Sequence, residues 1–305
     1  MAVSTQCRIH AVRRLLGMMH GAIIPSMSTL LSTRYRNAFI TGASAGLGRA
    51  FAEMLLAQGV EVWGTARDPA RLMMHEHFHA VALELGDGVA AERVFLAAEQ
   101  AAGGFDIVIN NAGFGVFGAF AHTDFAVWEE QWRIMLMNTA RLSHAALKGM
   151  LARKHGAIVN ISSLAGEFGM PYQAVYNSVK AGLSALSESL MCELCGTGVI
   201  VIDFRPGDYL TELEGALRHP PQAATLRDDA VNTQRMARTW ETFVKMMRAS
   251  PPPTHAAERL RHALQRGRNA TVRSGMFFQA IAGPFLARFA SLALRRRIQE
   301  KYFGL

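Results

Sequence analysis

Tyr176 and Lys180 are four residues apart in a stretch with helical spacing, which places both side chains on one helix face. A phenol with a reference pKa of about 10 is a poor acid/base near neutral pH, and a neighbouring ammonium group favours the phenolate. The pair therefore predicts a tyrosine that acts as general acid/base beside a lysine that lowers its pKa. Taken alone, the same spacing more often marks an exposed helix face, so the interpretation depends on the surrounding motifs.

A second candidate site is the glycine-rich turn that follows the first apolar run. Glycines at three positions allow a tight turn and let the backbone approach a pyrophosphate, while the next helix presents free N–H groups to that anion. Such a turn can instead serve tight packing of a helix on a strand. Its position at the start of the first strand–helix unit favours dinucleotide binding. The expected contacts are Gly42, Ser44, Gly46, Leu47 and Gly48.

These residues need a scaffold, and the hydrophobic pattern predicts one. Short runs rich in Val and Ile alternate with helical stretches, which is typical of a parallel sheet covered on both faces. Such sheets bind ligands at the carboxyl ends of their strands. We expect an α/β, doubly wound, Rossmann-type parallel sheet in a single domain, with a helical substrate lid and a C-terminal helical tail. The predicted strands are 37–42, 59–67, 105–110, 156–161 and 199–204, and the first helix is 46–58.

Three segments follow from this pattern. Residues 1–36 are an extension that is either a disordered tail, a targeting segment, or the result of translation beginning at Met27. Residues 37–255 are the catalytic domain, with the lid over about 209–255. Residues 256–305 are a basic amphipathic segment that either docks on the domain or contacts an anionic membrane without spanning it.

The end of the second predicted strand bears on the choice of cofactor. An acid there accepts hydrogen bonds from the ribose hydroxyls of NAD, whereas the 2′-phosphate of NADP needs a cation. The strand ends at Ala66, and Arg67 follows at once. This favours NADP(H) over NAD(H), with a solvated surface arginine as the alternative.

Together, the motifs resemble those of the short-chain dehydrogenase/reductase family over about residues 37–213. The residues that carry the resemblance are Thr41, Gly42, Gly46, Gly48, Asn110, Asn111, Ala112, Gly113, Asn138, Ser163, Tyr176, Lys180, Pro206, Gly207 and Thr211. The resemblance implies that Tyr176 is the general acid/base and that Ser163 holds the substrate oxygen. It implies further that Lys180 binds the nicotinamide ribose and that Asn138 orders a water of the proton relay.

The resemblance also assigns further cofactor contacts. Glu84 stands where the family usually has a shorter acid, and Leu85 stands where it has an apolar residue against the adenine. Asn111, Gly113, Pro206 and Gly207 pass along the cofactor, Asn110 ties strands together, and Thr211 binds the carboxamide. Asp208 and Tyr209, directly after Pro206-Gly207, depart from the family's usual residues.

Charge is unevenly distributed along the 305 residues. The formal net charge is +8, with six Arg and no acid in residues 1–52, and ten basic residues against two acids in 256–305. Since the ends contribute +6 and +8, the middle carries −6. A nucleic-acid groove needs its cations on the folded body, so nucleic acid is not an expected partner.

Two other motifs have competing interpretations. His75-Glu76-His77-Phe78-His79 contains a zinc-protease pattern, but it lies away from the expected cleft and no third ligand follows, so we expect exposed histidines near a helix end and no metal. Cys192 and Cys195 lack the strand–helix context of a redox motif and are expected to be buried free thiols.

The sequence thus predicts an NADP(H)-dependent oxidoreductase that interconverts an alcohol and a carbonyl. Met and aromatic residues in 214–255 indicate an apolar substrate, although they are as typical of ordinary core. The alternatives are a non-catalytic NADP-binding scaffold and a peripheral membrane protein. Three cysteines in a chain of this size favour a reducing compartment, the cytoplasm, and the family resemblance implies a homo-oligomer.

Overall fold

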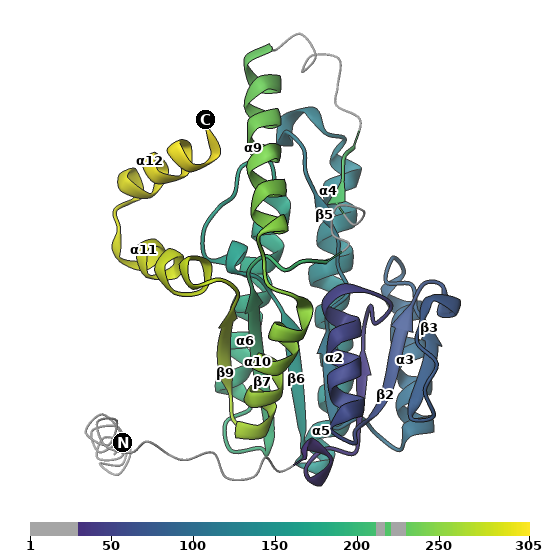
Figure 1. The fold of residues 1–305 in the computed structure, drawn as a ribbon. Coiled ribbons are helices and arrows are strands. Elements are labelled where there is room, and N and C mark those ends of the chain that lie inside the picture. Colours follow the sequence, from purple (N-terminus) through teal and green to yellow (C-terminus); the bar gives the residue numbers. More distant parts are fainter. Residues whose placement is uncertain (1–29, 212–216, 221–229) are drawn as a thin grey trace, which may run out of the picture.

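The computed structural model describes residues 30–211, 217–220 and 230–305, and a seven-stranded parallel sheet forms its centre (Figure 1). The strand order is β3-β2-β1-β4-β6-β7-β9, so the direction of winding reverses between β1 and β4. In open sheets, ligands bind beside this switch point. The strands are β1 (Asn37–Ile40), β2 (Glu61–Ala66), β3 (Phe78–Ala82), β4 (Ile107–Asn110), β6 (Gly156–Ile161), β7 (Val199–Pro206) and β9 (Ala270–Ser274).

Helices cover both faces of the sheet. On one face α2 (Gly46–Ala57) packs beside α10 (Pro253–Arg266), and the other face carries α3 (Gly88–Ala102), α5 (Asn138–Arg153) and α6 (Ala174–Glu193) (Figure 1). Every residue of β1, β4 and β6 is buried, which explains why these strands are near-continuous apolar runs. The predicted doubly wound α/β fold is confirmed.

The sheet continues further along the chain than the sequence pattern indicated. Most of α10 and all of β9 fall in the segment 256–305, which we interpreted as a tail. Leu260 and Leu264 are nevertheless buried in the core, and β9 pairs with β7. β9 is an edge strand whose exposed positions include Thr271 and Arg273, so it has no apolar run to reveal it. The tail therefore begins after Ser274.

Further elements lie beyond the carboxyl ends of the strands. α9 (Ala230–Arg248) extends away from the sheet, and the chain ends in α11 (Gly283–Phe289) and α12 (Leu292–Phe303) (Figure 1). β5 (Gly115–Val116) pairs with β8 (Leu217–Arg218), and α4 (Phe125–Trp132) leads into α5. Phe117, Phe243 and Phe303 are buried in one cluster, so the end of the tail docks on α9.

The packed core also includes residues before Asn37. Leu31, at the start of a 3-10 turn (Leu31–Thr33), and Tyr35 are buried against α2 and α10, and the Tyr35 hydroxyl donates to the Leu264 carbonyl at 3.4 Å. Part of the predicted extension is therefore core. The alternatives for residues 1–29, Cys7 included, lie outside the described residues.

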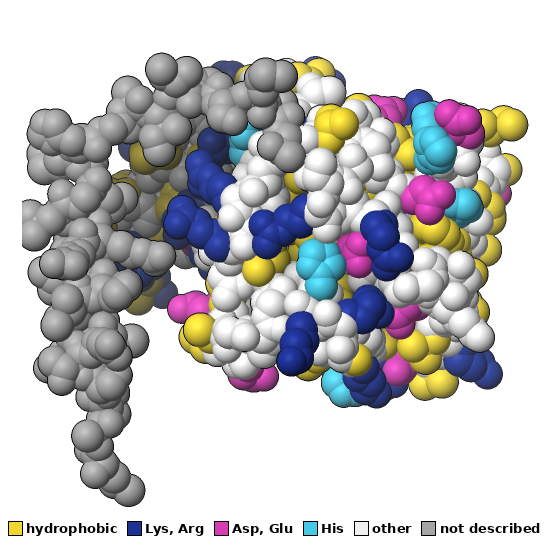
Figure 2. All heavy atoms as spheres, turned by 90° about the horizontal axis from the view of Figure 1, so that it is seen from below, with side chains coloured by type: hydrophobic (Ala, Val, Ile, Leu, Met, Phe, Trp, Pro, Cys, Tyr) yellow, Lys and Arg dark blue, Asp and Glu magenta, His cyan; other side chains and the backbone are white. Residues whose placement is uncertain are grey.

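The surface at the amino-terminal ends of the strands is electrostatically mixed. In Figure 2, Lys and Arg side chains lie among Asp, Glu and His side chains and do not gather in one patch. Within the described ranges, no helix is both long enough and apolar enough to cross a membrane.

Candidate active site

Ser163, Tyr176 and Lys180 are brought together at the carboxyl end of β6. Ser163 follows this strand and caps a 3-10 turn, so its Oγ accepts from the Ala165 N–H at 3.1 Å and donates to the Pro206 carbonyl at 3.3 Å. Tyr176 and Lys180 lie on the first turns of α6, with the lysine Nζ 5.5 Å from the centre of the tyrosine ring. The predicted shared helix face is therefore turned toward the serine.

Burial dominates the electrostatics of the tyrosine. Loss of water around the phenol raises the pKa of Tyr176 to about 12, the charge of Asp208 adds to the rise, and a hydrogen bond with Ser163 opposes it. Tyr176 is consequently a phenol at neutral pH, the form that donates a proton to a carbonyl oxygen.

Lys180 is held in place by a backbone contact at the end of β6. Its Nζ donates to the Ile161 carbonyl at 2.7 Å, and burial lowers the pKa of Lys180 to about 8, partly offset by the charge of Asp203. The ammonium group is thus tied to the end of β6, and burial is the largest influence on the pKa of the neighbouring tyrosine.

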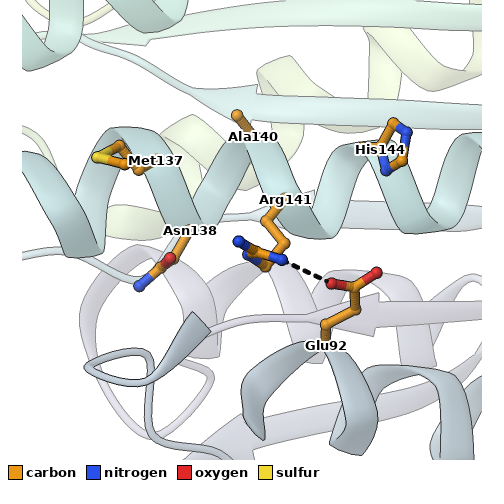
Figure 3. A pocket seen from close by; sticks show the side chains of 6 residues that line it. All are labelled: Glu92, Met137, Asn138, Ala140, Arg141 and His144. Atoms are coloured by element: carbon orange, nitrogen blue, oxygen red, sulfur yellow. Dashed lines mark hydrogen bonds and ion pairs between the residues drawn. The ribbon is translucent and has the colours of Figure 1, made fainter. Parts of the chain in front are cut away.

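Asn138 begins α5 directly after a π turn (Arg133–Met137), an irregularity common at functional sites. Its Nδ2 donates to the Leu85 carbonyl at 2.6 Å, so the side chain links α5 to the loop after β3. Asn138 also lines a pocket of about 370 Å³ that contains an ion pair between Arg141 and Glu92 (Figure 3). None of Ser163, Tyr176 and Lys180 lines that pocket.

The glycine-rich turn has the geometry of an anion cradle. Gly42 and Gly46 have φ values of +70° and +54°, and a Cβ on Gly48 would lie 2.0 Å from the Gly42 carbonyl oxygen. Only glycine fits these positions without strain. No side chain caps the start of α2, which leaves its first N–H groups free for an anion.

A second observation fits a nicotinamide cofactor. The Thr211 Oγ1 is buried and has no hydrogen-bond partner among the described residues, although buried polar atoms are normally satisfied. The same side chain approaches the turn, because a Cβ on Gly46 would lie 3.4 Å from the Thr211 Cγ2. A carboxamide between the turn and Pro206-Gly207 would supply the missing partner.

Two asparagines at the carboxyl end of β4 hold the turn and the neighbouring elements in place. Asn111 donates from Nδ2 to the Thr41 and Gly42 carbonyls at 3.0 Å each, so its side chain fixes the turn. Asn110 donates to Asn160 and to Ser143 at 2.9 Å each and ties β4 to its neighbours, as expected.

The predicted adenosine contacts lie at the other end of the turn. Arg67 follows β2 and is exposed. Leu85 is buried, whereas Glu84 is exposed and its Oε1 accepts from the Gly86 N–H at 2.9 Å. The Glu84 carboxylate thus turns back on its own loop. Gly113 packs against Met135, because a Cβ built on Gly113 would lie 2.9 Å from the Met135 Cε.

The prediction that Cys192 and Cys195 are buried is wrong. Cys192 and Cys195 are free but exposed, because α6 ends at Glu193 and only Leu194 of its final turn packs inward. His75, His77 and His79 lie in a turn and on β3, and do not form a helix that could carry a zinc-protease site. Within the described ranges, no group of three candidate ligands could hold a metal.

Sequence reasoning missed a buried network beneath Lys180. Asp203 accepts a short hydrogen bond from Ser162, and its Oδ2 lies 2.7 Å from the Arg205 Nε. The available signal was an acid inside the apolar run of β7.

The fold and these residues define a dinucleotide-dependent oxidoreductase, and comparison with known proteins identifies the family. The short chain dehydrogenase family model matches residues 36–222, more than half of the chain, so this chain belongs to that family. It is 33% identical over 194 residues to the 3-oxoacyl-[acyl-carrier-protein] reductase FabG of Escherichia coli, covering 62% of this chain and 80% of that protein. The FabG of Vibrio cholerae is 32% identical with the same coverage.

Solved structures show the same fold. A short chain dehydrogenase from Burkholderia cenocepacia, in complex with NADP, has a TM-score of 0.67 and 22% identity, covering 87% of this chain and 98% of that one. One from Burkholderia phymatum, in complex with NAD, has a TM-score of 0.72 and 23% identity, covering 89% and 97%. The protein is therefore an NAD(P)-binding oxidoreductase that acts on CH–OH or carbonyl groups.

Proposed function

We propose that the protein is an NADP(H)-dependent oxidoreductase that interconverts an alcohol and a carbonyl, with Tyr176 as general acid/base. The main support is the convergence of Ser163, Tyr176 and Lys180 at the carboxyl end of β6. In the reductive direction Tyr176 donates its proton to the carbonyl oxygen, which the Ser163 hydroxyl holds in place. A bound nicotinamide supplies the hydride.

Three further residues, Lys180, Asn138 and Thr211, are proposed to support this reaction. In this proposal Lys180 binds the nicotinamide ribose, and Thr211 receives the carboxamide with an Oγ1 that has no partner among the described residues. The role of Asn138 in ordering a water of the proton relay rests on the family resemblance alone. The turn from Gly42 to Gly48 receives the pyrophosphate, together with the start of α2.

The preference for NADP(H) rests on Arg67. Its guanidinium group is exposed directly after β2 and has no ion-pair partner among the described residues, so it is available to a 2′-phosphate. Of the solved structures named above, one holds NADP and the other NAD.

The substrate is proposed to have an apolar body. Phe117, Trp240, Phe243 and Met247 gather beyond the carboxyl end of the sheet, where β5 meets α9. Aromatic and methionine side chains make an adaptable apolar wall.

The direct test is fluorescence titration with NADPH and with NADH, followed by a screen of apolar ketones and aldehydes with the preferred cofactor. We expect tighter NADPH binding and reduction of at least one class of carbonyl. Binding without any turnover would favour a non-catalytic scaffold, and absence of binding would overturn the proposal.

Contact with an anionic membrane is a second candidate function, supported by the tail. An exposed apolar row lies on α11 and beside it, with Arg288, Arg296 and Arg297 also exposed. The row comprises Phe277, Phe278, Ile281, Phe285, Phe289 and Leu292.

Vesicle sedimentation tests this second candidate. We expect binding to vesicles that contain phosphatidylserine, and a loss of about tenfold or more when both Phe285 and Phe289 become Ser. The control is Leu151→Ser, which alters an exposed apolar residue on α5, away from the row. Equal binding by all three proteins would end the membrane hypothesis.

A further inference from the structure

Asp208 lies in the active site in an unusual electrostatic setting. It directly follows Pro206-Gly207, and its charge contributes to the raised pKa of Tyr176 on α6 and of Tyr302 on α12. Its neighbour Gly207 packs against the residue that follows Ser163, since a Cβ on Gly207 would lie 3.2 Å from the Leu164 Cδ1, so Asp208 lies beside the candidate active site. The known chemistry of the reaction gives it no role.

A side chain from the tail fixes the orientation of this carboxylate. Gln279, in the π turn that follows β9, donates from Nε2 to Asp208 Oδ2 at 2.6 Å. The same amide accepts from the Asp208 backbone N–H through Oε1 at 3.2 Å. The arrangement needs a glycine at position 207, because a Cβ there would lie only 2.6 Å from the Gln279 Oε1. The clamp leaves Oδ1 without a hydrogen-bond partner among the described residues.

Three other carboxylates with little solvent exposure have a cationic partner. Asp106, Glu167 and Asp203 each pair with an arginine, at 3.4, 2.8 and 2.7 Å respectively. Asp208 has no ion-pair partner in the described ranges, only the neutral amide of Gln279, and burial raises its pKa. Asp208 is half-buried, and its free oxygen can accept from a ligand cation, because a charge-assisted hydrogen bond is stronger than one between neutral groups.

We propose that Asp208, clamped by Gln279, is a substrate subsite that receives a protonated amino group carried close to the reacting carbon. This inference rests on the proposed oxidoreductase function and narrows it: the substrate is an amino alcohol or amino ketone with an apolar body. Oδ1 accepts the ammonium N–H while the carbinol oxygen lies between Ser163 and Tyr176. The tail therefore takes part in substrate selection through Gln279.

Calorimetric titration of the enzyme–NADP⁺ complex at neutral pH tests the subsite, using 1-phenylethanol and 2-amino-1-phenylethanol as matched probes. We expect the amino alcohol to bind at least about tenfold more tightly, as a charge-assisted hydrogen bond implies. Asp208→Asn, which keeps the shape and removes the charge, should bring the ratio of the two affinities close to one. Gln279→Leu, which removes the clamp, should lower it in part.

Glu300→Gln is the matched control, because it removes one exposed acid from α12 without altering the clamp, and the affinity ratio should stay at its original value. Equal binding of the two probes, no binding of either, or a preference that survives Asp208→Asn would overturn the subsite. Repeating the titration without cofactor separates the two proposals. An amine preference in a protein that does not bind NADP⁺ would contradict the oxidoreductase proposal and leave the subsite standing.

Discussion

Tyr176→Phe is expected to lower the rate of carbonyl reduction by about 10³-fold while NADPH binds as it does to the unaltered protein. The substitution removes the hydroxyl proposed to donate the proton beside Ser163, and general acid catalysis typically contributes about 10²–10⁴-fold. The ring and its packing against α6 neighbours remain. Steady-state reduction of the carbonyl found in the screen gives the rate, and fluorescence titration gives the affinity for NADPH.

Tyr35→Phe provides the matched control, because Tyr35 is buried at the other end of the sheet and its hydroxyl contacts only the Leu264 carbonyl among the described residues. Its activity should be unchanged. Retained reduction by Tyr176→Phe would show that another group supplies the proton.

The pH dependence of the unaltered enzyme follows from the same hydroxyl. Because burial raises the pKa of Tyr176 to about 12, the phenol is the form present below that pH, and the proton needed for reduction is available throughout the neutral range. Reduction should decline, and alcohol oxidation should rise, only as the pH approaches the pKa of the tyrosine in the cofactor complex.

The sequence predicted the central part of the fold because buried parallel strands carry a strong pattern. β1, β4 and β6 bury every side chain, so they appear as near-continuous apolar runs. β9 lies at the edge of the sheet and alternates Arg and Thr with smaller residues, so its pattern resembles a polar tail. The sequence pattern did not identify Leu31 and Tyr35 as core residues for a related reason: a few apolar positions show no helical or strand period.

The candidate site could be predicted where the chemistry lies within one element or one turn. Tyr176 and Lys180 share a helix, and Gly42, Gly46 and Gly48 share a loop. The clamp between Asp208 and Gln279 joins residues 71 positions apart, so no local sequence pattern could predict it. The mutual positions of such residues depend on the sheet that brings β7 beside β9.

Arg67→Ala is expected to weaken NADPH binding by about 10- to 100-fold and to leave NADH binding within about twofold, because a guanidinium–phosphate contact is a charge-assisted bidentate interaction. The nearest acid, Asp68, cannot readily replace it as a ribose ligand, since its Oδ1 caps the following turn by accepting from the Ala70 N–H at 3.0 Å. Fluorescence titration with each cofactor at one fixed salt concentration measures both affinities.

Arg71→Ala separates a specific contact from a general loss of positive charge. Arg71 is also exposed and lies four residues further along the same segment, in the turn that Asp68 caps. If Arg67 binds the 2′-phosphate, Arg71→Ala should change NADPH affinity by less than about twofold, because a solvent-screened charge away from the ligand contributes little. Equal losses in both variants would indicate long-range attraction alone. A preference for NADH in the unaltered protein would assign Arg67 to the solvated surface, and the ribose hydroxyls would then need an acceptor other than the capped Asp68.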